Sequence, residues 1–200
     1  METNGSIRSA QRSLRTVIRA SISLRSSASK TGTTISCLCR QCAIPTEVLS
    51  ANRKLTLNGA SIELKPYQPA HTDSDLSVSF TEPDILHTGD TYWNGVYPFI
   101  DYSTGGSIDG MIAASDANLA ASADSTIIIP GHGKPVSNKS ELTAFRDMLV
   151  DIRDKVAALK KAGRTLPETV AAMPTADHDA KWGHFVIDPA FFTKLVYEGV

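Results

Sequence analysis

The hydrophobic positions of this chain follow two different periods, one in its middle and one toward its C-terminus. Leu55 and Leu57 alternate with polar residues before the pair Asn58-Gly59, and the alternation resumes at Ile62. A period of two is typical of a strand with one buried face, and Asn-Gly favours a two-residue hairpin turn. The pattern therefore predicts a β-hairpin that ends near Pro66.

Three further segments have the character of strands. Residues 76–80 alternate apolar and polar side chains, residues 84–87 form a short fourth strand, and residues 127–129 are three consecutive isoleucines bounded by Pro130. A continuous apolar run is typical of a strand that is buried on both faces. We expect these segments to belong to one sheet.

The C-terminal half has the three- and four-residue spacing of amphipathic helices. The spacing is clearest over residues 141–162, and Gly163 follows as a stop signal. Ser107 is placed to cap a helix that reaches Leu119, residues 165–168 form a capping-box pattern, and a last helix is expected after Asp188-Pro189. Strands first and helices later predict an α/β fold in which helices cover a mixed sheet.

Composition predicts an ordinary soluble domain. The chain has 200 residues, of which 42% are hydrophobic and 20% charged, and its net charge is -1. The near-neutral balance predicts no general attraction to nucleic acid or to an anionic membrane. We expect no membrane span, because no apolar run approaches the roughly 18 residues that one needs.

The charge is concentrated at the N-terminus. Residues 1–46 carry seven basic residues and one acidic residue, Glu2. This composition predicts a disordered basic segment over residues 1–43 and a folded domain over residues 44–200. The segment resembles a mitochondrial transit peptide, and the alternative is that it is spurious and carries no address.

The cysteines Cys37, Cys39 and Cys42 all lie in this basic segment. An odd number of cysteines, with none in the rest of the chain, argues against a disulfide framework. A C-x-C-x-x-C run without a fourth ligand predicts incidental reduced thiols rather than a metal centre.

Three segments place a His or an Asp at the end of a short apolar run. They are Ala70-His-Thr-Asp-Ser-Asp75, Ile85-Leu-His-Thr-Gly-Asp90 and Thr126-Ile-Ile-Ile-Pro-Gly-His-Gly133. A buried strand fixes the backbone and lets a ligand emerge at its tip, and imidazole and carboxylate groups suit zinc. His71, Asp90 and His132 are therefore the candidate metal ligands.

In this order and at these intervals, the three motifs resemble the C-terminal half of a metallo-β-lactamase-fold hydrolase. The resemblance implies a partial αβ/βα sandwich and a zinc-dependent hydrolase that acts on a small-molecule substrate through metal-bound hydroxide. It implies that His71 binds a first metal ion, that His132 binds a second, and that Asp90 bridges the two and helps to hold the catalytic nucleophile.

The chain departs from the family at the His-x-His-x-Asp-His signature, which is absent. We therefore expect a truncated hydrolase with impaired activity. The alternative is a non-catalytic relic or binding module with no tightly bound metal. Half of a two-sheet core would expose an apolar sheet face and an unpaired edge, so we also expect self-association.

Other chemically capable residues lie near these motifs. Asp73 and Asp75 could orient His71 as hydrogen-bond acceptors, or they could simply form an Asp-rich turn. His87 is expected to be structural, and a ligand role is not expected for His178 or His184. Four aromatic residues follow Asp90 on an expected loop and could form either a substrate wall or core packing: Tyr92, Trp93, Tyr97 and Phe99.

Overall fold

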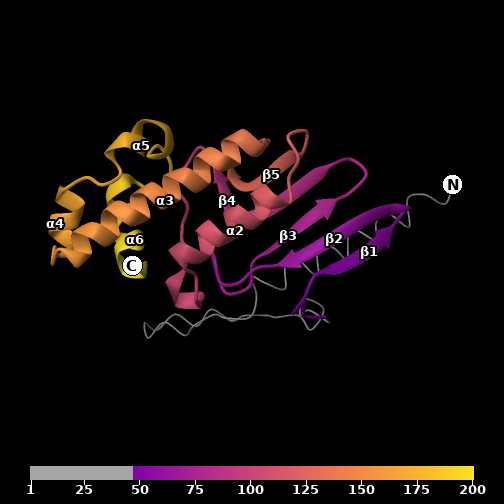
Figure 1. Cartoon of the computed structure of the whole chain (residues 1–200), viewed down its shortest axis with the longest axis horizontal. Coiled ribbons are helices and arrows are strands. Elements are labelled where there is room, and N and C mark those ends of the chain that lie inside the picture. The colour runs from indigo at the N-terminus through magenta and orange to yellow at the C-terminus, as the bar shows by residue number, and fades with distance from the viewer. Residues whose placement is uncertain (1–46) are drawn as a thin grey trace, which may run out of the picture.

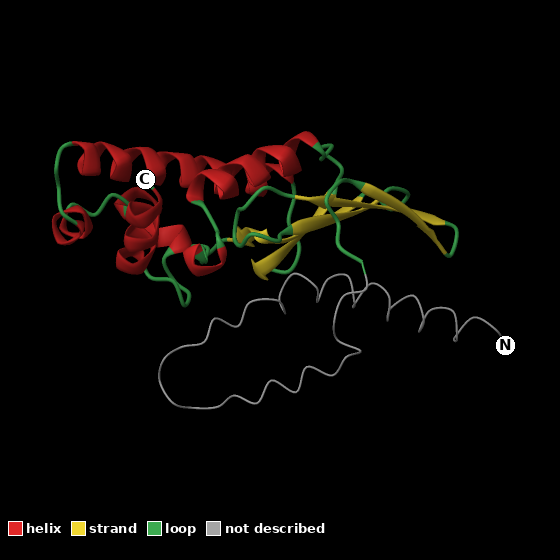
Figure 2. Ribbon diagram, turned by 90° about the horizontal axis from the view of Figure 1, so that it is seen from below, coloured by secondary structure: helices red, strands yellow, loops and turns green. Residues whose placement is uncertain are grey.

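The computed structural model describes residues 47–200, which form one sheet with helices on one side of it (Figures 1 and 2). The basic segment 1–43, its resemblance to a transit peptide and the three cysteines lie outside the described residues. Among the described residues, no helix is both long enough and apolar enough to cross a membrane.

The sheet has five strands in the order β1-β2-β3-β4-β5. Strands β1 (Arg53–Leu57), β2 (Ala60–Pro66), β3 (Leu76–Phe80) and β4 (Ile85–Asn94) are antiparallel neighbours, and β5 (Ile127–Gly133) is parallel to β4. The α/β class with a mixed sheet is therefore confirmed.

The predicted hairpin is formed by β1 and β2. Leu57 pairs with Ala60, and the two residues between them, Asn58 and Gly59, have φ angles of 51° and 79°. Both angles lie in the left-handed region that a type I′ turn requires, and Asn and Gly adopt this region most readily. The Asn-Gly prediction is confirmed.

Strands β4 and β5 are longer than the sequence pattern predicted. The short strand expected at residues 84–87 continues to Asn94, so Tyr92 and Trp93 lie in β4 rather than on a loop. The strand expected at residues 127–129 continues to Gly133. The register between β4 and β5 shifts on both sides of Gly89, and pairing then continues to Asn94 and Gly133. Sequence periodicity does not predict such a shift.

Three helices begin at the predicted capping residues, and α3 (Lys139–Lys161) begins two residues before the predicted start at Glu141. Ser107 caps α2 (Ile108–Ala120), Asn138 caps α3, Thr165 and Glu168 form the capping box of α4 (Leu166–Ala171), and Asp188 caps α6 (Pro189–Gly199). A 3-10 turn, η2 (Tyr102–Thr104), precedes α2. Helix α5 (Ala176–Trp182) was not predicted, because its seven residues contain one buried side chain, Trp182, and hence no apolar period.

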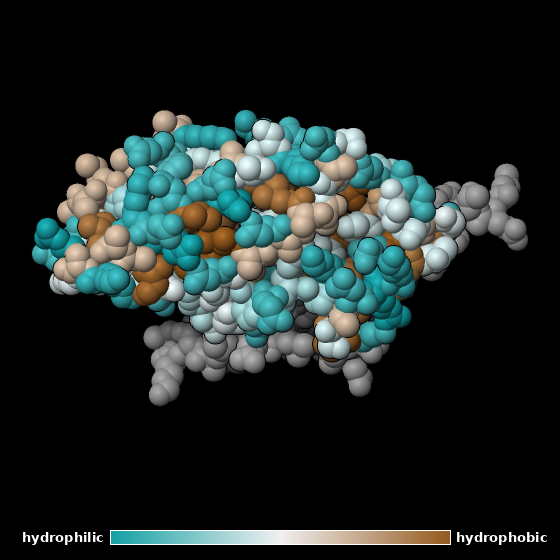
Figure 3. Space-filling view, viewed as in Figure 1, coloured by the Kyte–Doolittle hydropathy of each residue, from teal (hydrophilic) through white to brown (hydrophobic). Residues whose placement is uncertain are grey.

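The main core lies between the helices and one face of the sheet. Ile128 of β5 is completely buried there with side chains of α2, α3 and α6 such as Met111, Phe145 and Phe192. The outer surface of this helical side is largely hydrophilic, with smaller hydrophobic areas between the helices (Figure 3).

The opposite sheet face is also apolar. Ile62, Leu64 and Val78 form a second buried cluster there. Ile127, on the same face of the sheet, is 46% exposed, so the expectation that β5 is buried on both faces is wrong for this residue. The described helices cover only the other face, which explains the difference.

Candidate metal centre

The structure brings together the three residues that the sequence motifs single out. His71 lies between β2 and β3, Asp90 lies in β4, and His132 lies near the end of β5. The Nε2 atom of His71 is 3.5 Å from Oδ2 of Asp90, and the Nε2 atom of His132 is 3.4 Å from Oδ1 of the same carboxylate. One carboxylate therefore lies between two imidazoles that come from distant parts of the chain.

The orientation of His71 is set by a backbone carbonyl. Its Nδ1 atom lies 2.8 Å from the carbonyl oxygen of Phe99, which can only accept a hydrogen bond, so Nδ1 carries the proton. In a neutral ring, Nε2 then presents its lone pair to the carboxylate of Asp90. Two electron-rich atoms face each other across this gap, and a cation would stabilise the arrangement.

Both gaps match the spacing of ligands around a metal ion. They exceed the usual range of about 2.7–3.2 Å for an N–H···O hydrogen bond. Two ligand atoms that share a tetrahedral zinc ion at about 2.0–2.1 Å lie about 3.4 Å apart. The separations of 3.5 and 3.4 Å between imidazole nitrogen and carboxylate oxygen agree with that geometry.

Each ring faces a different oxygen of Asp90, so the contacts form two imidazole–carboxylate pairs that share one side chain. In agreement, no group of three or more His, Cys, Asp or Glu side chains within residues 47–200 could hold a metal ion. All five histidines of the sequence lie within this range. The donor types and spacings fit a metal, and each pair supplies two donors.

Gly131 makes room for the carboxylate. A Cβ atom at this position would lie 2.1 Å from Oδ1 of Asp90 and 2.7 Å from the carbonyl oxygen of Gly89. Either contact is far shorter than an ordinary van der Waals contact. Only glycine at position 131 therefore allows β5 to pass this close to the carboxylate of Asp90.

His132 is held by the indole of Trp93. The two ring centroids are 3.9 Å apart with an interplanar angle of 33°, and Trp93 is 5% exposed. The indole Nε1–H donates a hydrogen bond of 3.1 Å to the backbone carbonyl of Asp90. Trp93 therefore couples the position of the His132 ring to the backbone at Asp90.

A buried polar network supports β4 beneath the site. The hydroxyl of Thr91 donates to the carbonyl of Thr88 and accepts from the side-chain amide of Asn118 on α2. The hydroxyl of Tyr67 contacts the amide oxygen of Asn118, and burial raises the pKa of Tyr67 to about 12. Tyr67 therefore stays protonated and keeps its hydrogen bond across the physiological pH range.

Asp75 does not orient His71, because the Phe99 carbonyl has that role. Its carboxylate instead accepts hydrogen bonds from the backbone N–H and the hydroxyl of Thr72, which closes the turn that carries His71. Burial raises the pKa of Asp75 above its usual range. The Cβ atom of Asp73 lies against Gly105. The turn alternative is the one that the structure supports for Asp75.

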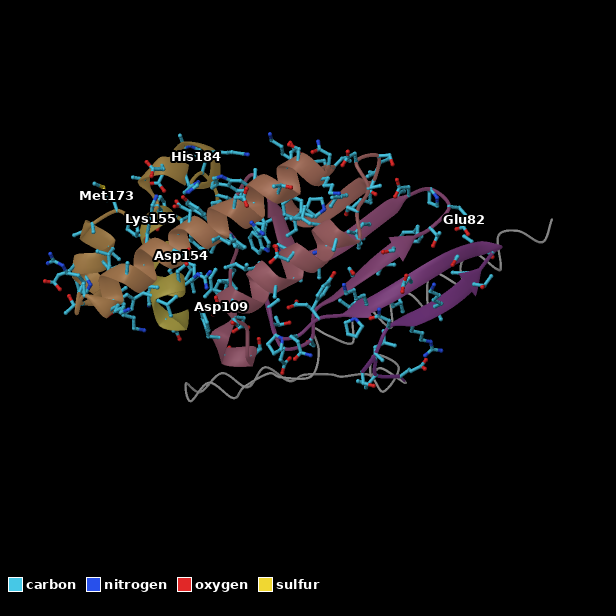
Figure 4. All side chains as sticks on the ribbon, in the orientation of Figure 1. Glu82, Asp109, Asp154, Lys155, Met173 and His184 are labelled. Carbon is cyan, nitrogen blue, oxygen red and sulfur yellow. The ribbon has the colours of Figure 1, made fainter. Side chains whose placement is uncertain are left out.

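The other three histidines lie outside the cluster. The ring of His87 accepts a hydrogen bond from the backbone N–H of Gly89, and burial lowers its pKa. His178 binds Asp151, which joins α5 to α3 (Figure 4 labels the neighbouring Lys155 on α3). His184 lies just beyond α5 and contacts the carbonyl oxygen of Ala180 within that helix (Figure 4 labels His184).

The four aromatic residues after Asp90 divide into two kinds. Tyr92 and Tyr97 are completely buried and belong to the core, where burial raises their pKa values. Trp93 and Phe99 lie beside the imidazoles, and the rings of Phe99 and His71 are 6.1 Å apart. The substrate-wall interpretation is therefore wrong for the two tyrosines.

Two contacts of the candidate site have no signal in the sequence: the hydrogen bond of His71 to Phe99 and the stacking of Trp93 on His132. The Phe99 carbonyl is a backbone atom, so no residue type signals its bond to His71. The stacking of Trp93 on His132 depends on the shifted register of β4 and β5, which pairs these two residues. The sequence marks Trp93 only as one of four aromatic residues after Asp90, and nothing in the sequence pairs it with His132.

Comparisons with known proteins give structural neighbours only. No protein-family profile matches the sequence, and no curated protein matches it. The stereoselective inverting sec-alkylsulfatase Pisa1 from Pseudomonas sp. has a TM-score of 0.59 and 19% identity, over 76% of this chain and 26% of that chain. A double mutant of the same enzyme gives a TM-score of 0.60 and 21% identity over the same shares.

A metallo-β-lactamase from Pontibacter korlensis matches with a TM-score of 0.47 and 16% identity, over 54% of this chain and 50% of that chain. This chain thus spans about a quarter of the length of the alkylsulfatases that it resembles. The alkylsulfatase has the metallo-β-lactamase fold, and the likeness to it extends over three quarters of this chain. The described residues therefore form a partial metallo-β-lactamase fold.

Proposed function

We propose that this chain is a metal-dependent hydrolase whose metal ligands are His71, Asp90 and His132, with zinc as the metal. The placement of one carboxylate between two imidazole nitrogens, at 3.5 and 3.4 Å, carries the proposal. Carboxylate and neutral imidazole are the donor types that zinc takes from proteins.

The chemistry follows from the donors. A metal ion held at this carboxylate supplies Lewis acidity and lowers the pKa of a water molecule so that hydroxide exists near neutral pH. Asp90 is in place to orient the nucleophile, because its oxygens lie between the two rings. Trp93 covers one face of the His132 ring.

A second candidate function is a binding module without hydrolysis. The observation that favours it is the arrangement of the donors as two pairs, with no group of three within residues 47–200. Two donors bind zinc far more weakly than the three or four of a complete site. The chain would then retain the fold and lack a tightly held metal.

Metal content separates the two functions. The full-length protein would be loaded with zinc, dialysed and analysed by mass spectrometry for bound metal, beside Asp90→Ala and His132→Ala. His184→Ala is the matched control, because it removes an exposed imidazole that lies just beyond α5 and contacts the carbonyl oxygen of Ala180 (Figure 4 labels His184). The hydrolase predicts near-stoichiometric zinc in the wild type and the control, and loss in both site variants.

Wild-type protein that retains no zinc would overturn the proposal and favour the binding module. Retained zinc that survives both site substitutions would show that other residues bind it. Hydrolysis of 4-nitrophenyl acetate by the zinc-loaded protein is the activity readout, and Asp90→Ala is expected to abolish it.

A further inference from the structure

A pair of stacked phenylalanine rings lies beside His71. Phe99 is 6.1 Å from the His71 ring, and Phe191 on the first turn of α6 is stacked on Phe99 with a centroid distance of 6.4 Å and an interplanar angle of 13°. Phe191 is 37% exposed although it is a large apolar side chain. The exposed ring of Phe191 is therefore connected to the candidate ligand His71 through the ring of Phe99.

A neighbouring pair of rings shows that structure alone does not require this exposure. Tyr97 lies in the segment after β4, as Phe99 does, and Phe192 lies in α6, as Phe191 does. The rings of Tyr97 and Phe192 are stacked at 4.6 Å with an angle of 12°, and both are completely buried. This inner pair already joins α6 to the segment that follows β4. The outer pair of Phe99 and Phe191 adds an open apolar surface to a connection that is complete without it.

The outer pair is also rigidly placed. The carbonyl of Phe99 accepts the hydrogen bond from His71, and the backbone N–H of Phe191 donates to the side chain of Asp188 at 2.7 Å. A surface that is fixed in the unbound state loses little entropy when a ligand binds to it. These are the properties of a preformed wall for the apolar part of a ligand.

We propose that Phe99 and Phe191 bind the hydrocarbon part of the substrate, so that this site takes substrates with an acyl or alkyl chain next to the bond that is cleaved. The proposal rests on the hydrolase function, which places the reacting group at Asp90. Phe191 is the specificity-determining residue, because it contributes exposed apolar area without touching the candidate ligands. Phe99 positions His71 through its backbone and contributes its ring to the same wall.

Binding of carboxylates of increasing chain length tests the wall without any catalysis. Butyrate, hexanoate and octanoate would be titrated into the full-length protein without metal, and binding followed by calorimetry. Full burial predicts that affinity rises about fourfold for each added methylene. Phe191→Ala is expected to remove most of this rise, and Phe191→Leu, which keeps part of the apolar area, to remove less of it.

Phe185→Ala is the matched control. Phe185 is 48% exposed and makes no ring contact with any other residue that the structure describes, so its loss is expected to leave the chain-length dependence unchanged. Affinities that do not depend on chain length, or a dependence that Phe191→Ala and Phe191→Leu both leave intact, would overturn the proposal.

A second experiment separates the wall from the hydrolase. Zinc-loaded protein would be assayed with 4-nitrophenyl acetate, butyrate and hexanoate, and the wall predicts that kcat/KM rises with chain length in the wild type and stays flat in Phe191→Ala. Chain-length-dependent binding with no hydrolysis of any ester would refute the hydrolase and support the wall. Hydrolysis that is equally fast for all three esters, with no chain-length-dependent binding, would refute the wall alone.

Discussion

Replacing Gly131 with alanine adds one methyl group at the point where β5 passes the carboxylate of Asp90. The new Cβ atom would lie 2.1 Å from Oδ1 of Asp90, and the carboxylate must retreat by roughly 1.3 Å to reach an ordinary contact at 3.4 Å. The same Cβ atom would lie 2.7 Å from the carbonyl oxygen of Gly89, so β4 must also move. The substitution therefore displaces Asp90, the residue that contacts both His71 and His132.

The expected loss of metal affinity follows from this displacement. Ligand distances in metal sites are held within about 0.2 Å, and a misplacement of about 1 Å lowers the function of a preorganised site by roughly 100-fold. We therefore expect Gly131→Ala to weaken zinc binding about 100-fold. Overpacking of the two strands is expected to lower the free energy of unfolding by about 1–3 kcal/mol.

Competition between the protein and a chromophoric zinc chelator measures the affinity, and urea unfolding measures the stability. Gly163→Ala is the control for the introduction of a methyl group. Gly163 has a φ of 81° with nothing within 4 Å of the added Cβ, so this variant is destabilised by backbone strain alone. Its zinc affinity should equal that of the wild type. Zinc affinity in Gly131→Ala within threefold of the wild type would refute the assignment of Asp90 as a ligand.

Two further predictions concern stability and association. Hydrogen bonds from Thr126 and Ser125 lower the pKa of Asp84, so its contribution to stability is present above the unfolded-state pKa near 3.8 and is lost as the pH falls through the lower folded value. Asp84→Asn, which suits the left-handed backbone there, is expected to lower the urea midpoint at pH 7, and the difference should shrink as the pH is lowered below the unfolded-state pKa; a constant difference would contradict the reasoning. We also expect self-association through the sheet face that carries Ile127, which is 46% exposed, so Ile127→Lys should shift gel-filtration elution toward the monomer; a wild-type monomer at all concentrations would exclude it.

The sequence by itself was enough to locate the elements whose signals are local. The Asn-Gly turn requires two left-handed residues, the long period-3.6 helix α3 buries one stripe of its surface, and the caps of α2, α4 and α6 satisfy backbone groups within three residues. The sequence also singles out His71, Asp90 and His132, but the expected position at a strand end is right only for His132. His71 lies between β2 and β3, and Asp90 lies within β4. Turns, caps and helix periodicity depend on residues a few positions apart, so they can be predicted from a single sequence.

Only the tertiary structure decided how these residues meet. The parallel pairing of β4 with β5 joins segments about 40 residues apart, and its shifted register brings Trp93 opposite His132. The carbonyl of Phe99 selects the tautomer of His71, and Gly131 allows the close approach to Asp90. Helix α6 brings Phe191 to Phe99 across more than 90 residues. Register, backbone acceptors and steric clearance depend on which surfaces pack together, and that information is absent from any single segment of the chain.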